Sequence, residues 1–134
     1  IEEYVRLSQL AKSRVVVTKD IGLHELLLVS DVVLTVSSTT GLWALIYDKP
    51  LVVITLFPLP EYNILEEAGI LVNKLEDLPT ILQQVLEDTD ISSDRKIKKE
   101  LFIKDHLHRV DGQASNRIAK IILKLANRNT PDSA

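Results

Sequence analysis

The fold is decided by residues 31–53, which read DVVLTVSSTTGLWALIYDKPLVV. The apolar run 31–36 predicts a strand that is covered on both faces. Residues 39–47 predict a helix, which Lys49-Pro50 ends because the residue before a proline disfavours helical geometry. The β-branched run 51–55 predicts a second strand. A strand, a helix and a strand at this spacing form a βαβ unit, in which the two strands are parallel.

The same alternation continues on both sides of this unit. Apolar spacing predicts helices over 2–12, 22–30, 61–68, 75–86, 90–105 and 113–126, and short β-branched or apolar runs predict strands over 14–18 and 70–72. Gly69 stands where a helix commonly ends. The pattern predicts an α/β fold, an open, mostly parallel Rossmann-like sheet with helices on both faces, right-handed crossovers and a helical C-terminus.

The size of the chain fits one domain. It has 134 residues, of which 46% are hydrophobic, enough for a core. We expect the domain to span residues 1–127 and the patternless end, 128–134, to be disordered. The sequence opens at Ile1, without a methionine and directly in a helical pattern, so we expect a fragment of a longer protein.

Composition excludes several classes of function. The net charge is −3 and the pI is about 5.6, so no general positive field attracts nucleic acid or an anionic membrane. Cysteine is absent, which excludes disulfides, thiolate zinc sites and a thiol nucleophile and is compatible with the cytoplasmic location that we expect. No run reaches the roughly 18 apolar residues of a transmembrane segment, and we expect no signal peptide.

The most informative candidate site is the connection between the strand 31–36 and the next helix. It contains Ser37, Ser38, Thr39, Thr40 and Gly41. Ligands of such sheets bind outside the carboxyl ends of the strands, and the amide groups of a helix N-terminus attract anions. Hydroxyl donors would add to this cradle, and a glycine would let the backbone approach a phosphate closely. The alternative is an ordinary helix cap, for which one hydroxyl suffices.

These residues carry a resemblance to a known family. The stretch SDVVLTVSSTTGLWALIYDKPLVVI, residues 30–54, resembles the C-terminal nucleotide-binding domain of GT-B glycosyltransferases. It is most similar to the branch of the UDP-N-acetylglucosamine 2-epimerases and CDP-glycerol glycerophosphotransferases. The stretches EEAGILVNKLEDLPTILQQVLED, residues 66–88, and DGQASNRIAKII, residues 111–122, resemble later parts of the same domain. The resemblance extends over about residues 13–127.

The resemblance implies a nucleotide-sugar-binding half of a GT-B fold. Ser37, Ser38 and Thr39 would meet the diphosphate of a UDP- or CDP-linked substrate, without a cofactor or a metal. The family usually has a glutamate, which contacts ribose or sugar hydroxyls, where this sequence has Trp43. Catalytic groups often come from the other domain, so no catalytic residue is assigned here. The expected partners are the nucleotide sugar and that N-terminal domain or a partner subunit, and a homo-oligomer remains open.

Further residues lie where a sugar or base would be contacted. They are His24 after Gly22, Trp43, and Glu61, Tyr62 and Asn63 in the loop that follows the strand 51–55. A surface position for His24, a buried indole against the sheet for Trp43 and a plain loop for 61–63 are the alternatives. For Trp43, we expect burial. His106 and His108 have no evident partners for a metal site. Arg109 could reach a phosphate, and a surface ion pair is the alternative for both Arg109 and Arg117.

Two functions remain open at this stage. The first is the nucleotide-sugar-binding part of a GT-B-type glycosyltransferase or UDP-sugar 2-epimerase-like enzyme. The second is a non-catalytic, degenerate domain of the same fold, used for assembly or regulation. Trp43 at the position of the family's glutamate favours the second, whereas the surplus of hydroxyls in the turn favours the first.

Overall fold

A three-stranded parallel sheet forms the centre of the molecule. The computed structural model describes residues 2–11, 14–56, 64–87 and 91–128. The strands β1 (Val33–Thr35), β2 (Leu51–Ile54) and β3 (Ile70–Val72) lie in the order β1-β2-β3. Val33 is paired with Leu51, and Val52 with Ile70. The predicted open, parallel α/β sheet is confirmed; β1 and β2 are three residues and one residue shorter than their predicted runs, and β3 has the predicted bounds.

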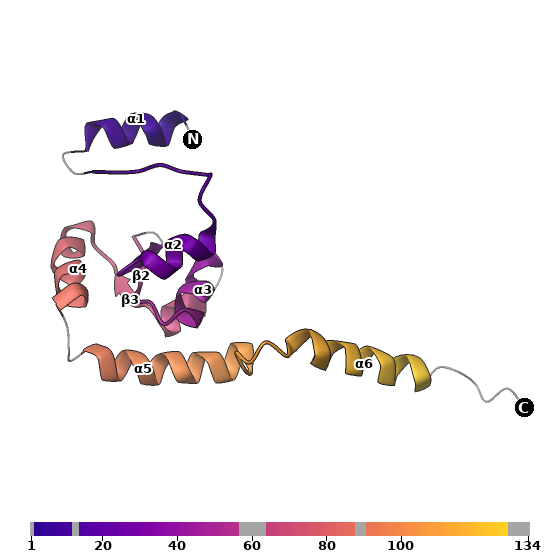
Figure 1. Cartoon of the computed structure of the whole chain (residues 1–134). Helices are drawn as coiled ribbons and strands as arrows, with labels where there is room; N and C mark the ends of the chain where they lie inside the picture. Colours follow the sequence, from indigo (N-terminus) through magenta and orange to yellow (C-terminus); the bar gives the residue numbers. More distant parts are fainter. Residues whose placement is uncertain (1, 12–13, 57–63, 88–90, 129–134) are drawn as a thin grey trace, which may run out of the picture.

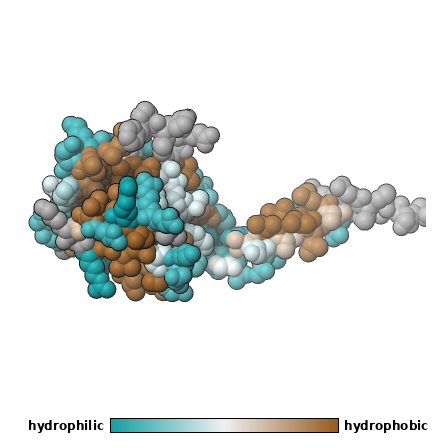
Figure 2. Space-filling model, turned by 90° about the horizontal axis from the view of Figure 1, so that it is seen from above, coloured by the Kyte–Doolittle hydropathy of each residue, from teal (hydrophilic) through white to brown (hydrophobic). Residues whose placement is uncertain are grey.

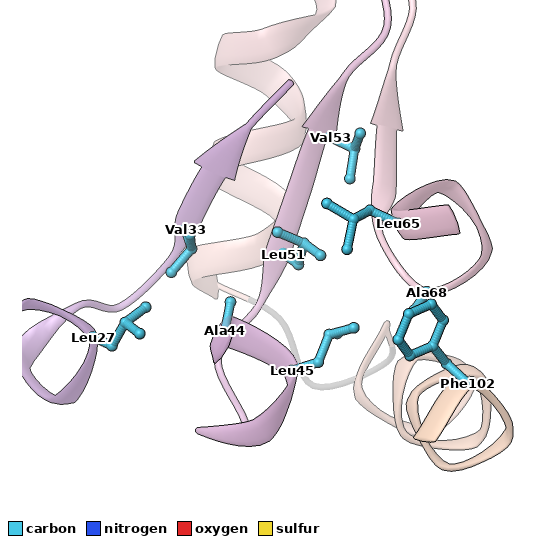
Figure 3. Packing of buried hydrophobic residues seen from close by; sticks show 9 residues of the cluster. All are labelled: Leu27, Val33, Ala44, Leu45, Leu51, Val53, Leu65, Ala68 and Phe102. Carbon is cyan, nitrogen blue, oxygen red and sulfur yellow. The ribbon is translucent and has the colours of Figure 1, made fainter. Parts of the chain in front are cut away.

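One face of the sheet is covered by α2 (Leu23–Val29) and α3 (Thr40–Ile46). The two helices bury their apolar side chains against alternate residues of β1 and β2, as the two-residue period of a strand requires. Figure 3 shows this core, which consists of Leu27, Val33, Ala44, Leu45, Leu51, Val53, Leu65, Ala68 and Phe102. Leu65 comes from the short 3-10 helix η1 (Ile64–Glu67).

The opposite face is covered by α4 (Leu78–Glu87), which follows the 3-10 turn η2 (Leu75–Asp77). Here Val52 and Val72 point away from the first core and pack against Val85. Pro79 stands in the first turn of α4, where its missing N–H is harmless. Helices therefore lie on both faces of the sheet, as the sequence predicts.

A long helix, α5 (Ile91–Phe102), runs along one end of the sheet and continues as the π-helical turn η3 (Ile103–Leu107) (Figure 1). Phe102 is 2% exposed and completes the first core. Two polar contacts flank it, since Lys99 binds Asp48 and His106 Nε2 lies 2.7 Å from Glu67 Oε2. Asp48 follows α3 with a left-handed φ of 59°, a conformation that Asp and Asn adopt more readily than other non-glycine residues.

The first and the last helix stand apart from this body. α1 (Glu2–Leu10) buries none of its side chains, and α6 (Ala114–Arg128) extends away from the sheet beyond α5 (Figure 1). Arg128, the first residue of the predicted tail, belongs to α6, and 129–134 lie outside the described residues. No helix in the described ranges has the length and apolar character that crossing a membrane requires.

The strand predicted over 14–18 is wrong. These residues run as a segment between α1 and α2 that pairs with no strand in the described part of the chain (Figure 1), and Val15 and Val16 are 49% and 65% exposed. A β-branched run favours extended backbone, but a strand exists only where a neighbour pairs with its N–H and C=O groups. The described sheet consequently has three strands instead of four.

Candidate functional site

The hydroxyl turn lies at the carboxyl end of β1, as predicted. β1 ends at Thr35, and α3 begins at Thr40. Ser37, Ser38 and Thr39 are exposed, Thr40 is half-buried and Gly41 is buried. The turn is held to the strand by the amide of Ser38, which donates to Thr35 Oγ1 at 3.2 Å.

One serine provides the cap of α3. The amide of Thr40 donates to Ser38 Oγ at 3.2 Å, and Ser38 Oγ donates to Thr40 Oγ1 at 3.0 Å. Thr39 precedes the helix but forms no side-chain cap. Within the described ranges, the hydroxyls of Ser37 and Thr39 have no hydrogen-bond partner. Capping therefore accounts for Ser38 alone, and two exposed donors remain for a ligand.

The packing of α3 explains why a glycine stands at position 41. A Cβ at this position would lie 2.6 Å from Leu65 Cδ1 and 3.4 Å from Leu51 Cδ2. The missing side chain thus lets α3 pack directly against η1 and β2. This packing explains the glycine without a ligand, in contrast to the close approach to a phosphate that the sequence suggests.

Two polar residues that the sequence analysis missed extend this edge of the sheet. Thr55 follows β2 and Asn73 follows β3; Thr55 Oγ1 hydrogen-bonds to Asn73 Oδ1, and the amide of Thr55 donates to the carbonyl of Val72 at 2.9 Å. The strand register aligns Thr35 with Val53 and Ile54 with Val72, so Ser37, Thr55 and Asn73 each follow a strand at the same level. Neighbouring strands lie about 4.8 Å apart, so this row spans about 10 Å. The sequence contains a signal for both, because Thr55 and Asn73 are the first polar residues after the apolar runs 51–54 and 70–72.

His24 and Trp43 come together on the flank of α3, about one helical turn from the hydroxyl turn. Their rings meet edge to face at a centroid distance of 4.9 Å, and His24 Nδ1 lies 3.0 Å from the hydroxyl of Tyr47. Trp43 is 40% exposed, so the expectation of a buried indole is wrong. α3 buries Gly41, Ala44 and Leu45, and the helical period places Trp43 and Tyr47 together on another face.

The other residues that the sequence suggests for a site do not lie at the hydroxyl turn or are not described. Glu61, Tyr62 and Asn63 lie outside the described residues. Arg117 Nη1 donates to both carboxylate oxygens of Asp111, at 2.8 Å to Oδ1 and 2.7 Å to Oδ2, which confirms a surface ion pair for Arg117. Its guanidinium holds the pKa of Asp111 below its usual range, helped by the amide of Gln113. In the described part of the chain, no three acidic or histidine side chains form a metal site.

A separate hollow of about 320 Å³ opens beside the amino end of β3. Its charged lining residues come from η1 and α5, and two of them, Lys98 and Asp94, are paired at 2.9 Å. The hollow lies at the opposite end of the strands from the hydroxyl turn. It therefore does not belong to the candidate site.

The comparisons with known proteins concern the N-terminal part of the chain. Residues 1–57 match the model of a family described as capsule polysaccharide biosynthesis protein. This match covers less than half of the chain, and it includes β1, the hydroxyl turn, α3 and β2. It suggests a glycosyltransferase-like family of capsule polysaccharide biosynthesis. No curated protein and no solved structure matches the chain.

Proposed function

We propose that this chain is the nucleotide-sugar-binding part of a glycosyltransferase-type enzyme of capsule polysaccharide biosynthesis. The ligand would be a UDP- or CDP-linked sugar, with its diphosphate on the turn from Ser37 to Gly41. The proposal rests chiefly on one observation, which is that two hydroxyls of this turn are exposed, serve no cap and lie at the carboxyl edge of a parallel sheet. The match to the capsule family covers this same segment.

The chemistry of the turn suits a diphosphate. Ser37 and Thr39 would donate hydrogen bonds to phosphate oxygens, and bonds to a charged acceptor are stronger than those between neutral groups. Thr55 and Asn73 would extend the polar row toward the rest of the ligand. When the glycosyl bond breaks, negative charge grows on the departing diphosphate, and donors already in place stabilise that charge.

We place the ring of the ligand, a base or a sugar, near His24 and Trp43. Trp43 is one helical turn from Thr40, so roughly 5 Å of helix separates the phosphates from the indole. The exposed face of an indole is a suitable surface for a ring. The reaction itself would take place in the cleft between this unit and a second α/β domain, which would contribute the catalytic groups.

Calorimetry tests the proposal. UDP, CDP and GDP are titrated into the chain and into Ser37→Ala/Thr39→Ala. We expect one pyrimidine nucleotide to bind and the double variant to bind it at least about tenfold more weakly, since a hydrogen bond to a charged group contributes about 1.5–3 kcal/mol. Ser115→Ala, which removes an exposed hydroxyl from α6, is the matched control and retains the wild-type affinity.

The outcome that defeats the proposal is equally definite. It fails if none of the three nucleotides binds, or if the double variant binds as well as the wild type. A separate variant, Ser38→Ala, removes the cap of α3 and reports how far a loosened helix alone weakens binding.

A non-catalytic domain is the second candidate. The first turn of α3 contains no acidic residue, whereas the family that the sequence resembles has a glutamate there. This candidate predicts nucleotide binding without turnover. The full-length protein separates the two, because an enzyme releases UDP or CDP from the sugar nucleotide in the presence of an acceptor, and a binding domain does not.

A further inference from the structure

α6 presents a continuous apolar stripe that nothing in the described structure covers. Ile118, Ile121, Ile122 and Leu125 are 54–59% exposed. Their spacing of three, one and three residues places them on one side of the helix. Figure 2 shows the stripe as a brown band along the arm that leaves the body. An exposed aliphatic surface of this length calls for an occupant.

The charge of α6 is opposite to that of the rest of the chain. The helix contains Arg117, Lys120, Lys124 and Arg128 and no acidic residue, which is a formal charge of +4. The whole chain has a net charge of −3, so the remainder carries −7. The cations recur at intervals of three and four residues, and they form a second stripe beside the apolar one. Since Arg117 is paired with Asp111, Lys120 and Lys124 are the exposed cations of the middle of the helix.

The backbone between η3 and α6 directs α6 away from the sheet, so that the sheet and its helices do not block the apolar and cationic stripes of α6. His108 and Gly112 have left-handed φ values of 62° and 69° and separate α6 from η3. Asp111 then fixes the start of the helix, since its carboxylate accepts from the amide of Gln113 at 2.9 Å and from Arg117. The helix consequently extends as an arm with all of its described side chains exposed or half-buried (Figure 1).

We propose that α6 lies flat on an anionic phospholipid surface. Its aliphatic side chains would enter the boundary of the acyl chains, and Lys120 and Lys124 would lie among the phosphate headgroups. An apolar face beside a cationic face is the pattern of helices that lie in the membrane interface. Four cations in fifteen residues make α6 unsuited to the hydrocarbon interior.

A second copy of the chain is the less suitable occupant. Two α6 helices would bring eight cations and no anion together. The other exposed helix, α1, has nine residues, and its acidic residues are Glu2 and Glu3 in the first turn. These two could face only part of the cationic stripe. A lipid surface offers negative charge along the whole length of the helix.

Vesicle flotation of the whole chain tests the proposal. We expect binding to vesicles of equimolar phosphatidylcholine and phosphatidylglycerol, at least about tenfold weaker binding to pure phosphatidylcholine, and release as salt is raised. Lys120→Glu/Lys124→Glu lowers binding to the anionic vesicles at least about tenfold. Lys19→Glu/Lys74→Glu, which makes the same charge change at exposed positions elsewhere, leaves most of the binding in place.

The apolar stripe has its own variant and control. Ile118→Ser/Ile122→Ser abolishes binding to anionic vesicles, whereas Leu28→Ser/Val29→Ser, at positions 61% and 77% exposed on α2, does not. Far-UV circular dichroism compares the total helix content of each variant with that of the wild type, and an unchanged spectrum shows that no helix has been lost. The comparison of lipids and salt on the unaltered chain requires no variant at all.

Three results overturn the proposal. They are equal binding to neutral and anionic vesicles, no effect of Lys120→Glu/Lys124→Glu, and a dimer in analytical ultracentrifugation that Ile118→Ser/Ile122→Ser dissolves while vesicles stay unbound. The last result would assign the stripe to a second copy. None of them bears on nucleotide binding at the hydroxyl turn, which is measured in the absence of lipid.

Discussion

α5 and α6 follow one another along the chain, and only α5 packs against the sheet. α5 has a mixed, highly charged sequence that suggests a solvated helix, but its last residue, Phe102, is 2% exposed. α6 has the more regular apolar stripe, and its described side chains remain exposed or half-buried. One aromatic side chain with a fitting cavity and two polar contacts therefore fix a helix more firmly than four aliphatic side chains without a complementary surface.

The largest expected effect comes from removing that aromatic side chain. Phe102→Ala would leave a cavity among Leu45, Leu65 and Ala68, and we expect it to lower the free energy of unfolding by about 3–5 kcal/mol. Urea unfolding followed by circular dichroism measures the change. Leu125→Ala in α6 is the control, because an exposed substitution changes stability by about 0.5 kcal/mol or less. Similar losses in the two variants would contradict the contrast between the helices.

A smaller effect is expected at η3. His106 lies against Phe102, with ring centroids 4.6 Å apart, and contacts Glu67. His106→Ala should lower the free energy of unfolding by about 1 kcal/mol, since it loses a ring contact and a polar contact. In a Glu67→Gln background, the same substitution should cost less. If His106→Ala lowers the free energy of unfolding equally in both backgrounds, the contact between His106 and Glu67 does not contribute to stability.

The ion pair between Asp48 and Lys99, which stands in the last turn of α5, makes the packing of this helix depend on pH. The hydrogen bond from Lys99 lowers the pKa of Asp48, against the opposing effect of burial, and the charges of Lys99, Arg95 and Lys96 lower it further. The carboxylate therefore stabilises the folded state above its unfolded pKa of about 3.9, and this contribution is lost as the pH falls through the lower, folded pKa.

Asp48→Asn isolates this contribution, because asparagine also tolerates the left-handed backbone. The side chain of Asp48 is 75% exposed, so solvent screening limits the loss at pH 7 to about 1 kcal/mol or less. Unfolding measured from pH 7 to pH 2 should show the variant and the wild type converging at the acidic end. A constant difference across this range would exclude the ion pair as its cause.

The smallest effect is local and belongs to α6. Arg117 and the amide of Gln113 lower the pKa of Asp111, so the anchor of the helix is present above the usual pKa of an aspartate and is lost as the pH falls through the folded value. We expect Asp111→Asn to speed hydrogen exchange of the amides in the first turns of α6 and to leave global unfolding unchanged. A lowered global stability would show that α6 is packed against the body after all.

Most of the fold follows from the sequence because its strands and helices lie close together along the chain. The runs at 31–36, 51–55 and 70–72 become strands, and the helix predicted over 39–47 forms as α3. Of the helix predicted over 61–68, residues 61–63 lie outside the described part of the chain, and Ile64–Glu67 form the short 3-10 helix η1 instead of an α-helix. The run 14–18 looks the same in sequence but remains unpaired, because pairing depends on a neighbour in space. The π-helical turn of η3 has no sequence pattern that predicts it. It lies between two tertiary contacts, the burial of Phe102 in the core and the contact of His106 with Glu67.

The candidate site is predictable to a similar degree. The hydroxyl turn follows from the order of strand and helix, and the structure adds that Ser38 alone caps α3. Thr55 and Asn73 join it only through the register of three strands, which the sequence does not encode locally. The predicted burial of Trp43 is wrong because the buried face of α3 consists of Gly41, Ala44 and Leu45, and Trp43 lies on another face of the helix.

Trp43 has a spectroscopic consequence. It is the only tryptophan in the sequence, its indole is partly exposed and it touches His24 about one helical turn from the hydroxyl turn. α6 contains no aromatic residue. The intrinsic tryptophan emission of the unlabelled protein therefore reports on one place alone. A change in emission on adding a nucleotide therefore reports a change around Trp43, where α2 and α3 meet. Binding of α6 to a membrane should leave the emission largely unchanged.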